Sequence, residues 1–182
     1  MPTYIAFLRA INLGSRHKFS PAQVAAACVK AGCTDVATHI NTGNVRLTTT
    51  LRSRARIESM LEQAFFDDRG FPVPTIVFTP ADLAAVVADA DELAAARAED
   101  DAVGQQYVSV LKDVPSAEAS AAVEAKGTAG ERAYVRGRAV HLLIGKSYHG
   151  ARLSNATVEK LLGVATNRNV TVMRAIAAKW CP

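Results

Sequence analysis

The chain has 182 residues, 49% of them hydrophobic, and a formal net charge of +4, which is typical of a folded globular protein rather than a disordered or fibrous one. No apolar run approaches the roughly 20 residues that span a bilayer, and the start lacks the basic region and cleavage site of a signal peptide. Three cysteines cannot all pair within one chain. We therefore expect a cytoplasmic protein with reduced thiols and no membrane partner.

The first 79 residues predict elements in the order βαββαβ, which is the split unit of ferredoxin-like folds. The segment Thr3–Arg9 is nearly all apolar, as in a central strand. Ser20 and Pro21 are typical of a helix N-cap and first helical residue. The later elements are a hairpin around Gly43, a helix that ends at Gly70, and a last strand over 72–79.

The rest of the chain predicts an acidic helical connection over 80–101 and a second pass through the same elements over 102–182. This pass has a strand from 105, a helix over 115–126, a hairpin around Gly137 and a helix capped by Ser154. We then expect a helix beginning near 166–169, with Thr166 or Asn167 as its cap, in place of a last strand. The predicted class is α+β, with two ferredoxin-like (βαββαβ-type) subdomains, the second lacking its last strand and ending in a C-terminal helix.

Charge is unevenly spread along the chain. Residues 1–79 carry nine Lys or Arg and five acids, residues 80–101 carry one Arg and seven acids, and residues from 132 onward carry nine Lys or Arg and one acid. A basic final third can recruit a phosphate-bearing partner. Alternatively, the acidic middle folds back and neutralises it.

Two groups of motifs resemble one known family. Near the start stand YIAFLRAINLG over 4–14 and NTGNV over 41–45, and near the end stand EKLLG over 159–163 and TNRN over 166–169. Together they resemble the domain-of-unknown-function 1697 family over essentially the whole chain. The resemblance implies two ferredoxin-like subdomains and no established activity. Ala10 and Ser15 stand where that family usually has glycine, and Val170 where it usually has tryptophan.

The loop from Arg9 to Lys18 is the first candidate site. Arg9 ends a buried strand, where a cation is costly unless it is paired. Asn12 can brace a turn, and Gly14 permits positive φ or a close approach. With Lys18 before a helix start, these residues predict a cradle for phosphate or carboxylate. Equally, Arg9 can pair with an internal carboxylate and Asn12 can serve the turn alone.

Two further segments are candidates. Asn44 follows Gly43 in a tight hairpin, where turn chemistry alone explains both residues. Arg168 and Asn169 are expected in the first turn of the last helix, where a cation opposes the helix dipole. Arg168 would then reach a carboxylate, the subdomain interface or a bound anion.

Other chemistries find little support in the sequence. The histidines are scattered, so we expect no metal and no cofactor. The run Gly145-Lys146-Ser147 lacks the first glycine of a P-loop, because Val140 stands in its place. The expected hairpin strand, 44–48, carries no aromatic residue on which RNA bases could stack.

We expect a protein that binds a small anionic, phosphate- or carboxylate-bearing ligand in a basic cleft between the subdomains, with Arg9, Asn12, Lys18 and Arg168 as principal contacts. An enzyme of unknown reaction using that cleft is the alternative, with His17 as the only nearby titrating group. A nucleic-acid-binding module is possible but not favoured. A monomer and a homodimer, which exposed strand edges would permit, both remain open.

Overall fold

The structure is a computed structural model that describes residues 1–15, 17–97, 104–128, 130–145 and 151–181. Three points of the sequence analysis lie outside the described residues: Arg16 of the first loop, the end of the acidic connection at 98–101, and Lys146-Ser147. The chain forms two compact units, Met1–Leu83 and Ala84–Cys181. Among the described helices, none has the length and apolar character needed to cross a bilayer.

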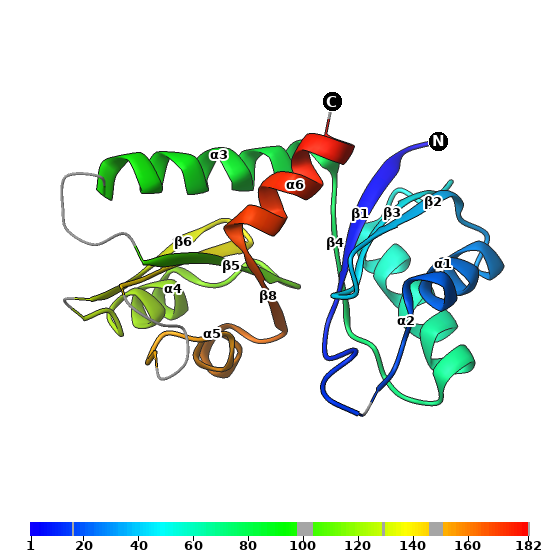
Figure 1. The fold of residues 1–182 in the computed structure, drawn as a ribbon, viewed down its shortest axis with the longest axis horizontal. Coiled ribbons are helices and arrows are strands. Elements are labelled where there is room, and N and C mark those ends of the chain that lie inside the picture. The colour runs from blue at the N-terminus through cyan, green and yellow to red at the C-terminus, as the bar shows by residue number, and fades with distance from the viewer. Residues whose placement is uncertain (16, 98–103, 129, 146–150, 182) are drawn as a thin grey trace. The chain divides into compact units, whose positions relative to one another are not determined.

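The first unit has the predicted βαββαβ order (Figure 1). Its sheet has the strand order β2-β3-β1-β4, and every neighbouring pair is antiparallel. The elements are β1 (Thr3–Leu8), α1 (Pro21–Lys30), β2 (Thr34–His39), β3 (Asn44–Thr48), α2 (Arg54–Arg69) and β4 (Thr75–Phe78).

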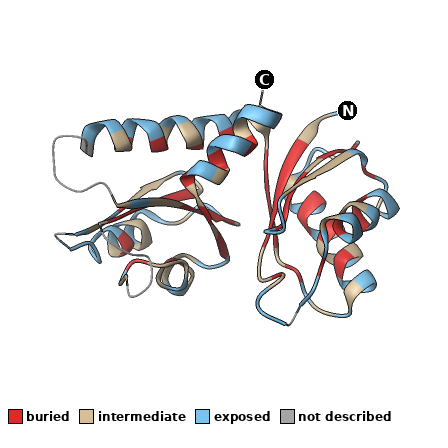
Figure 2. Cartoon of the chain, viewed as in Figure 1, coloured by how far each residue is buried: buried red, intermediate tan, exposed pale blue. Residues whose placement is uncertain are grey.

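Local sequence signals explain where these helices begin and end. Ser20 caps α1 in a capping box with Gln23, and Pro21 is its first residue, as predicted. Ser53 caps α2, and Gly70 ends it with φ +72°. Both helices pack on one face of the sheet, and the side chains they share with it form a buried core (Figure 2). That core includes Tyr4, Ala6, Leu8, Phe19, Val24, Cys28, Val45, Leu47, Ile57, Leu61, Phe65 and Val77.

The second unit repeats this topology with the sheet order β6-β7-β5-β8. Helices α4 and α5 pack on one face around a second core, and α3 and α6 lie on the opposite face (Figure 1). The elements are α3 (Pro80–Arg97), β5 (Gln105–Leu111), α4 (Ala117–Glu124), β6 (Glu131–Arg136), β7 (Ala139–Ile144), α5 (Asn155–Leu162), β8 (Ala165–Asn169) and α6 (Val170–Trp180).

The two ferredoxin-like subdomains and the C-terminal helix are confirmed, but the expected absence of the last strand of the second subdomain is wrong. Residues 165–169 form β8, which pairs antiparallel with β5 from Leu111↔Ala165 to Tyr107↔Asn169. Neither Thr166 nor Asn167 caps the last helix. Asn169 does, because its side chain accepts from the N–H of Thr171 at 2.8 Å. Arg168 is therefore a strand residue, not part of a first helical turn.

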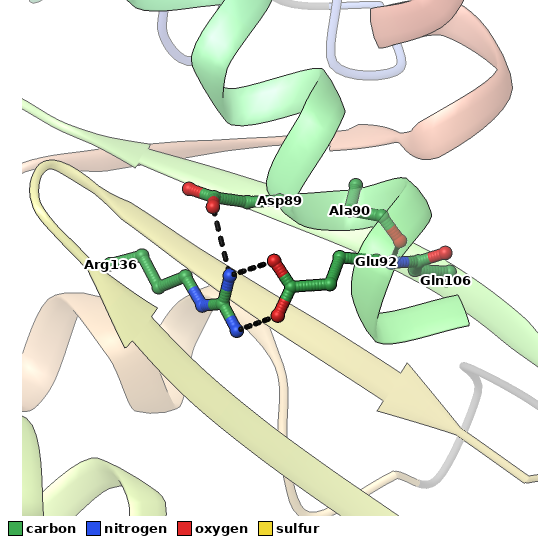
Figure 3. A network of polar contacts seen from close by, with 5 residues as sticks. All are labelled: Asp89, Ala90, Glu92, Gln106 and Arg136. Atoms are coloured by element: carbon green, nitrogen blue, oxygen red, sulfur yellow. Dashed lines mark hydrogen bonds and ion pairs between the residues drawn. The ribbon is translucent and has the colours of Figure 1, made fainter. Parts of the chain in front are cut away.

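The acidic segment 80–97 forms one long helix, which belongs to the second unit from Ala84 onward. Asp89 and Glu92 of α3 hold Arg136 of β6, with N–O distances of 2.9 Å to Asp89 and 3.0 and 3.1 Å to Glu92 (Figure 3). Beside them, the Gln106 side chain donates to the Ala90 carbonyl at 2.9 Å. The hydrogen bond from Arg136 lowers the pKa of the Glu92 carboxyl.

A second ion pair joins α3 to α6, where Arg174 lies 2.6 Å from Asp91. Three acids of the middle segment thus face two arginines of the basic final third. For these side chains the structure shows the second of the two alternatives, in which acidic and basic segments neutralise one another within a fold. They need no phosphate-bearing partner to balance their charge.

Helix glutamates cover the outer edge of β4 in the first unit. Glu62 of α2 accepts from the N–H of Thr75 at 2.8 Å, and Glu58 accepts from the N–H of Val77 at 2.9 Å. Both N–H groups point away from β1, so they would otherwise be available to another strand.

The same arrangement covers both edges of the second sheet. Glu124 of α4 accepts from the N–H of Val135 in β6 at 2.8 Å, and Glu159 of α5 accepts from the N–H of Ala165 in β8 at 3.3 Å. Covering edge N–H groups in this way prevents one sheet from pairing with another. Three of the four edge strands are therefore protected by carboxylates.

Candidate functional site

The two units end their central strands in the same way. In the first, the Leu8 N–H donates to the Gly43 carbonyl at 2.8 Å, and the Arg9 N–H donates to the Pro74 carbonyl at 2.9 Å. In the second, the N–H groups of residues 111 and 112 donate to the carbonyls of residues 138 and 164 at 2.9 and 3.0 Å. After this shared point the chains differ: residues 112–116 lead directly into α4, but the longer segment 9–20 leads into α1.

The fold itself does not require the longer loop, since the second unit forms the same topology without it. Connections that exceed the short lengths usual between elements often carry binding sites. Segment 9–20, hereafter the first loop, is therefore the candidate site. It contains the predicted residues Arg9, Asn12, Gly14 and Lys18.

Left-handed backbone conformations are concentrated in the first loop. Ala10, Asn12 and His17 have φ of +59°, +56° and +51°, and Gly14 has +57°. A non-glycine residue with positive φ is uncommon, and for a β-branched residue it is a genuine outlier. Such an outlier occurs beside the first loop, in the β2–β3 turn, where Ile40 has φ +50°. Strain of this kind persists only where surrounding contacts hold the backbone in place.

Asn12 supplies those contacts. Its side-chain amide donates to the carbonyls of Phe19 and Asn41, both at 2.9 Å, and its side-chain oxygen accepts from the N–H of Phe19 at 2.9 Å. Its own N–H donates to the His17 carbonyl at 2.9 Å. Asn12 thus closes the first loop on itself and fastens it to the β2–β3 turn. Asn12 thus has the structural role in the turn that is the alternative to ligand binding.

A small pocket, partly open to solvent, lies where the first loop, the start of α1 and the β2–β3 turn meet. Most of its wall is apolar, and its polar groups come from Thr38, Asn41 and Asn44. A mostly apolar concavity with a few polar groups is the usual form of a small-ligand site. The lining residues are Ile11, Phe19, Pro21, Val24, Thr38, Ile40, Asn41, Gly43, Asn44 and Val45.

The sequence-predicted residues stand around this pocket in different roles. Asn44 is fully buried, and its side-chain amide donates to the His39 carbonyl at 3.0 Å and to the Thr42 hydroxyl at 2.9 Å. Gly43 has φ +76°, and a Cβ there would lie 2.7 Å from the Leu8 Cβ. Only glycine therefore fits where the turn meets β1. Asn44 and Gly43 shape the turn that forms one wall of the pocket.

The charged residues near the pocket are basic. Lys18 is exposed and directly precedes Phe19 in the pocket wall, whereas Arg9 is half-buried at the end of β1. Gly14 is exposed, and its positive φ shapes the loop. His17 is exposed and stacks on Phe71 at 4.5 Å between ring centroids. It forms no ion pair with a described carboxylate.

Arg168 and Asn169 belong to the second unit and do not line this pocket. The Arg168 guanidinium is buried and donates to the Thr166 hydroxyl at 2.9 Å and to the Asn167 carbonyl at 2.8 Å. Burial lowers the pKa of Arg168 to about 10. Asn169 caps α6. Both residues thus have structural contacts within the second unit.

Other reactive groups are placed as core residues. Burial and the neighbouring Cys33 raise the pKa of Cys28 to about 12, so its thiol is a poor nucleophile. His141 of β7 is fully buried, and neither ring nitrogen has a hydrogen-bond partner. Among the described residues, no group of three or more His, Cys, Asp or Glu is arranged to hold a metal ion.

Sequence reasoning located the first loop but missed most of the pocket wall. Phe19 comes from the first loop, and Thr38 and Ile40 come from the end of β2 and the turn after it; none of the three carries a chemical signal of its own. The available signal was the difference in length between the two connections that follow the central strands. The comparison is meaningful because β1 and β5 occupy equivalent positions in their two sheets.

A family model described as "Protein of unknown function (DUF1697)" matches residues 1–141. Among solved structures, one titled "The structure of conserved bacterial protein SP0830 from Streptococcus pneumoniae" is similar, with a TM-score of 0.70 and 20% identity over 97% of each chain. Likeness at this identity extends to the fold alone. No curated protein matches the chain.

Proposed function

Because the chain belongs to the DUF1697 family, whose function is unknown, we propose a function from the site itself: the protein binds a small anionic ligand in the pocket beside the first loop. The ligand carries a carboxylate or phosphate and a compact apolar group. The apolar group occupies the wall formed by Ile11, Phe19 and Val24, and the anionic group lies toward Lys18.

One observation carries this proposal. Segment 9–20 is longer than its counterpart 112–116, adopts left-handed backbone at several residues and is fastened by Asn12 to the opposite wall of a pocket. Strained residues cluster at functional sites because the geometry of a site has to be held in place before the ligand arrives. A connection serving the fold alone has no need of this arrangement, as the second unit demonstrates.

Charge supports an anion rather than a cation. Every formal charge in segments 9–20 and 37–46 is positive, and neither segment contains an acidic residue. Lys18 has no polar contact with another described residue, so its ammonium is available to a ligand. Positive potential around an apolar pocket attracts anions and raises their local concentration.

The test uses isovalerate, which joins a branched apolar group to a carboxylate, and its neutral isostere isovaleramide. We expect isovalerate to shift the backbone amide NMR signals of Ile11, Phe19 and Thr38, with isovaleramide binding more weakly. Lys18→Ala should weaken isovalerate binding by up to about fivefold, because an exposed ion pair contributes at most about 1 kcal/mol. Lys30→Ala removes an exposed lysine from the last turn of α1 as a matched control and should leave binding unchanged.

Inorganic phosphate is titrated in parallel to identify the type of anion. Signal changes confined to residues outside the pocket would overturn the proposed site. Equal binding of isovalerate and isovaleramide would overturn the preference for an anion.

A further inference from the structure

The edge strand β2 lacks the carboxylate cover that the other three edge strands have. At the eighth residue of α4, Glu124 accepts from the N–H of Val135 in β6. At the eighth residue of α1 stands Cys28, and α1 contains no acidic residue at all. The helix beside β2 is therefore unable to cover the edge as its counterpart does.

The hydrogen-bond alternation shows which groups of β2 point outward. Leu8 and Gly43 are a hydrogen-bonded pair, and in an antiparallel ladder every second pair is hydrogen-bonded. The N–H and C=O of Val45, two residues after Gly43, therefore also bond to β1, where Val45 lies opposite Ala6. Thr38 lies opposite Val45 on the other side of β3, so its N–H and C=O point away from the sheet. No described residue bonds to these two groups.

The open part of this edge is short. The register shifts between Thr34 and Ala37, and Asp35 has φ +48°, so the start of β2 is irregular. Such bulges prevent further pairing. At the other end Ile40 turns the chain with φ +50°. A free edge centred on Thr38 alone is too short for the strand of a second copy, but it suits the end of a peptide.

The pocket lies directly beside this edge, because Thr38 belongs to both. On the α1 side its wall is formed by Pro21 and Val24. An extended chain paired with Thr38 would direct alternate side chains toward the pocket, since successive side chains of a strand point to opposite faces. This is the geometry by which edge strands recognise peptides: main-chain hydrogen bonds give affinity, and a side-chain pocket gives specificity.

Building on the proposed function, we propose that the anionic ligand is the C-terminus of a peptide. Its backbone pairs with Thr38, its last apolar side chain enters the pocket and its carboxylate lies toward Lys18. The pocket is small and partly open to solvent, which suits one branched side chain rather than a drug-sized ligand. The basic first loop complements a free carboxylate, which the end of a chain provides on the same residue as its last side chain.

The test uses an acetylated pentapeptide ending in valine with a free carboxylate, and the same peptide with a C-terminal amide. We expect the free acid to bind at least tenfold more tightly. At saturation it should slow hydrogen exchange of the Thr38 N–H at least tenfold. The Val135 N–H, which already donates to Glu124, should be unaffected and serves as the internal control.

Thr38→Pro removes the outward N–H, a change that an edge strand tolerates because that group takes no part in the ladder. It should abolish binding of the free-acid peptide. If the variant does not fold, exchange at Thr38 in the unaltered protein still decides the question.

Isovalerate binding without peptide binding, or peptide binding that leaves Thr38 exchange unchanged, overturns this inference and leaves the proposed function standing. Equal binding of the acid and amide peptides also overturns it. Failure of both the peptide and isovalerate to bind overturns both proposals.

Discussion

Asn12 and Phe19 form two reciprocal hydrogen bonds, in which the Asn12 side-chain oxygen accepts from the Phe19 N–H and the Asn12 amide donates to the Phe19 carbonyl, each at 2.9 Å. The same amide donates to the Asn41 carbonyl. The three hydrogen bonds of this one side chain thus do the work that backbone hydrogen bonds do between neighbouring strands. It holds the first loop against the β2–β3 turn, and the pocket lies where they meet.

Asn12→Asp should therefore destabilise the first unit. The carboxylate keeps the bond from the Phe19 N–H, but it loses both donations and faces two carbonyls. Leaving polar groups without partners in this way costs about 1–3 kcal/mol. Urea unfolding followed by the amide signals of β1 measures the loss. The control is Asn41→Asp, because Asn41 contributes its backbone carbonyl to this contact; it should change stability by less than about 0.5 kcal/mol. Equal losses in the two variants would contradict the bracing role of Asn12.

Ala10→Gly should stabilise the protein. Ala10 has φ +59°, a conformation that costs an L-residue about 1–2 kcal/mol. Glycine removes this cost. It also raises the conformational entropy of the unfolded chain, which offsets about 0.4–1 kcal/mol of the gain in stability. We expect a rise in Tm of a few degrees, measured by calorimetry. Ala31→Gly, at the C-cap of α1 with φ −76°, gains no such relief and should lower Tm. A fall in both variants would show that Ala10 is not strained.

The stability of the second unit should fall in acid because of His141. Burial lowers the pKa of His141 to about 4 from its usual 6.5, so the folded protein keeps the ring neutral. The unfolded chain binds a proton first, and the stabilisation, complete above pH 6.5, is lost as the pH falls toward 4. At 1.36 kcal/mol per pKa unit the loss reaches about 3 kcal/mol.

Urea unfolding at pH 7.5, 6 and 4.5 measures this effect through the fluorescence of Trp180, the only tryptophan of the chain. Trp180 is buried in α6 of the second unit. In His141→Met the same pH series should be flatter. An identical pH dependence in both proteins would assign the effect to other groups.

Arg136→Ala should loosen α3 from the second sheet. Its guanidinium contacts both Asp89 and Glu92, whereas Arg174 contacts Asp91 alone. We therefore expect a larger fall in the urea midpoint than for Arg174→Ala. Salt screens partly exposed charges, so the difference should shrink in 1 M NaCl. A salt-independent difference would point to lost packing of the arginine stem instead.

The sequence predicted the first unit well because its local signals agree with its tertiary structure. Ser20, Pro21 and Gly70 mark helix ends by their own chemistry, and the apolar run of β1 identifies a central strand. The strand β8 escaped prediction for the opposite reason. Asn167 and Asn169 favour turns and caps, and only pairing with β5 makes this segment extended. That pairing depends on residues far away in the sequence.

The candidate site was predictable only in part. The sequence indicated that Asn12 and Gly14 shape a loop, because these residue types tolerate left-handed backbone. The pocket depends on how Phe19, Thr38 and Ile40 come together, and apolar or hydroxyl side chains give no separate sign of that. The contacts of Arg168 were likewise hidden, because its burial follows from its place in a sheet.

The shared hydrogen bonds at the ends of β1 and β5 separate the frame of each unit from the connection that follows it. The entropy of closing a loop grows only slowly with its length, so the longer segment 9–20 adds little to the cost of folding. If the proposed function holds, substitutions in this segment that keep Asn12 and the buried Phe19 should alter what the pocket binds while the sheet stays constant.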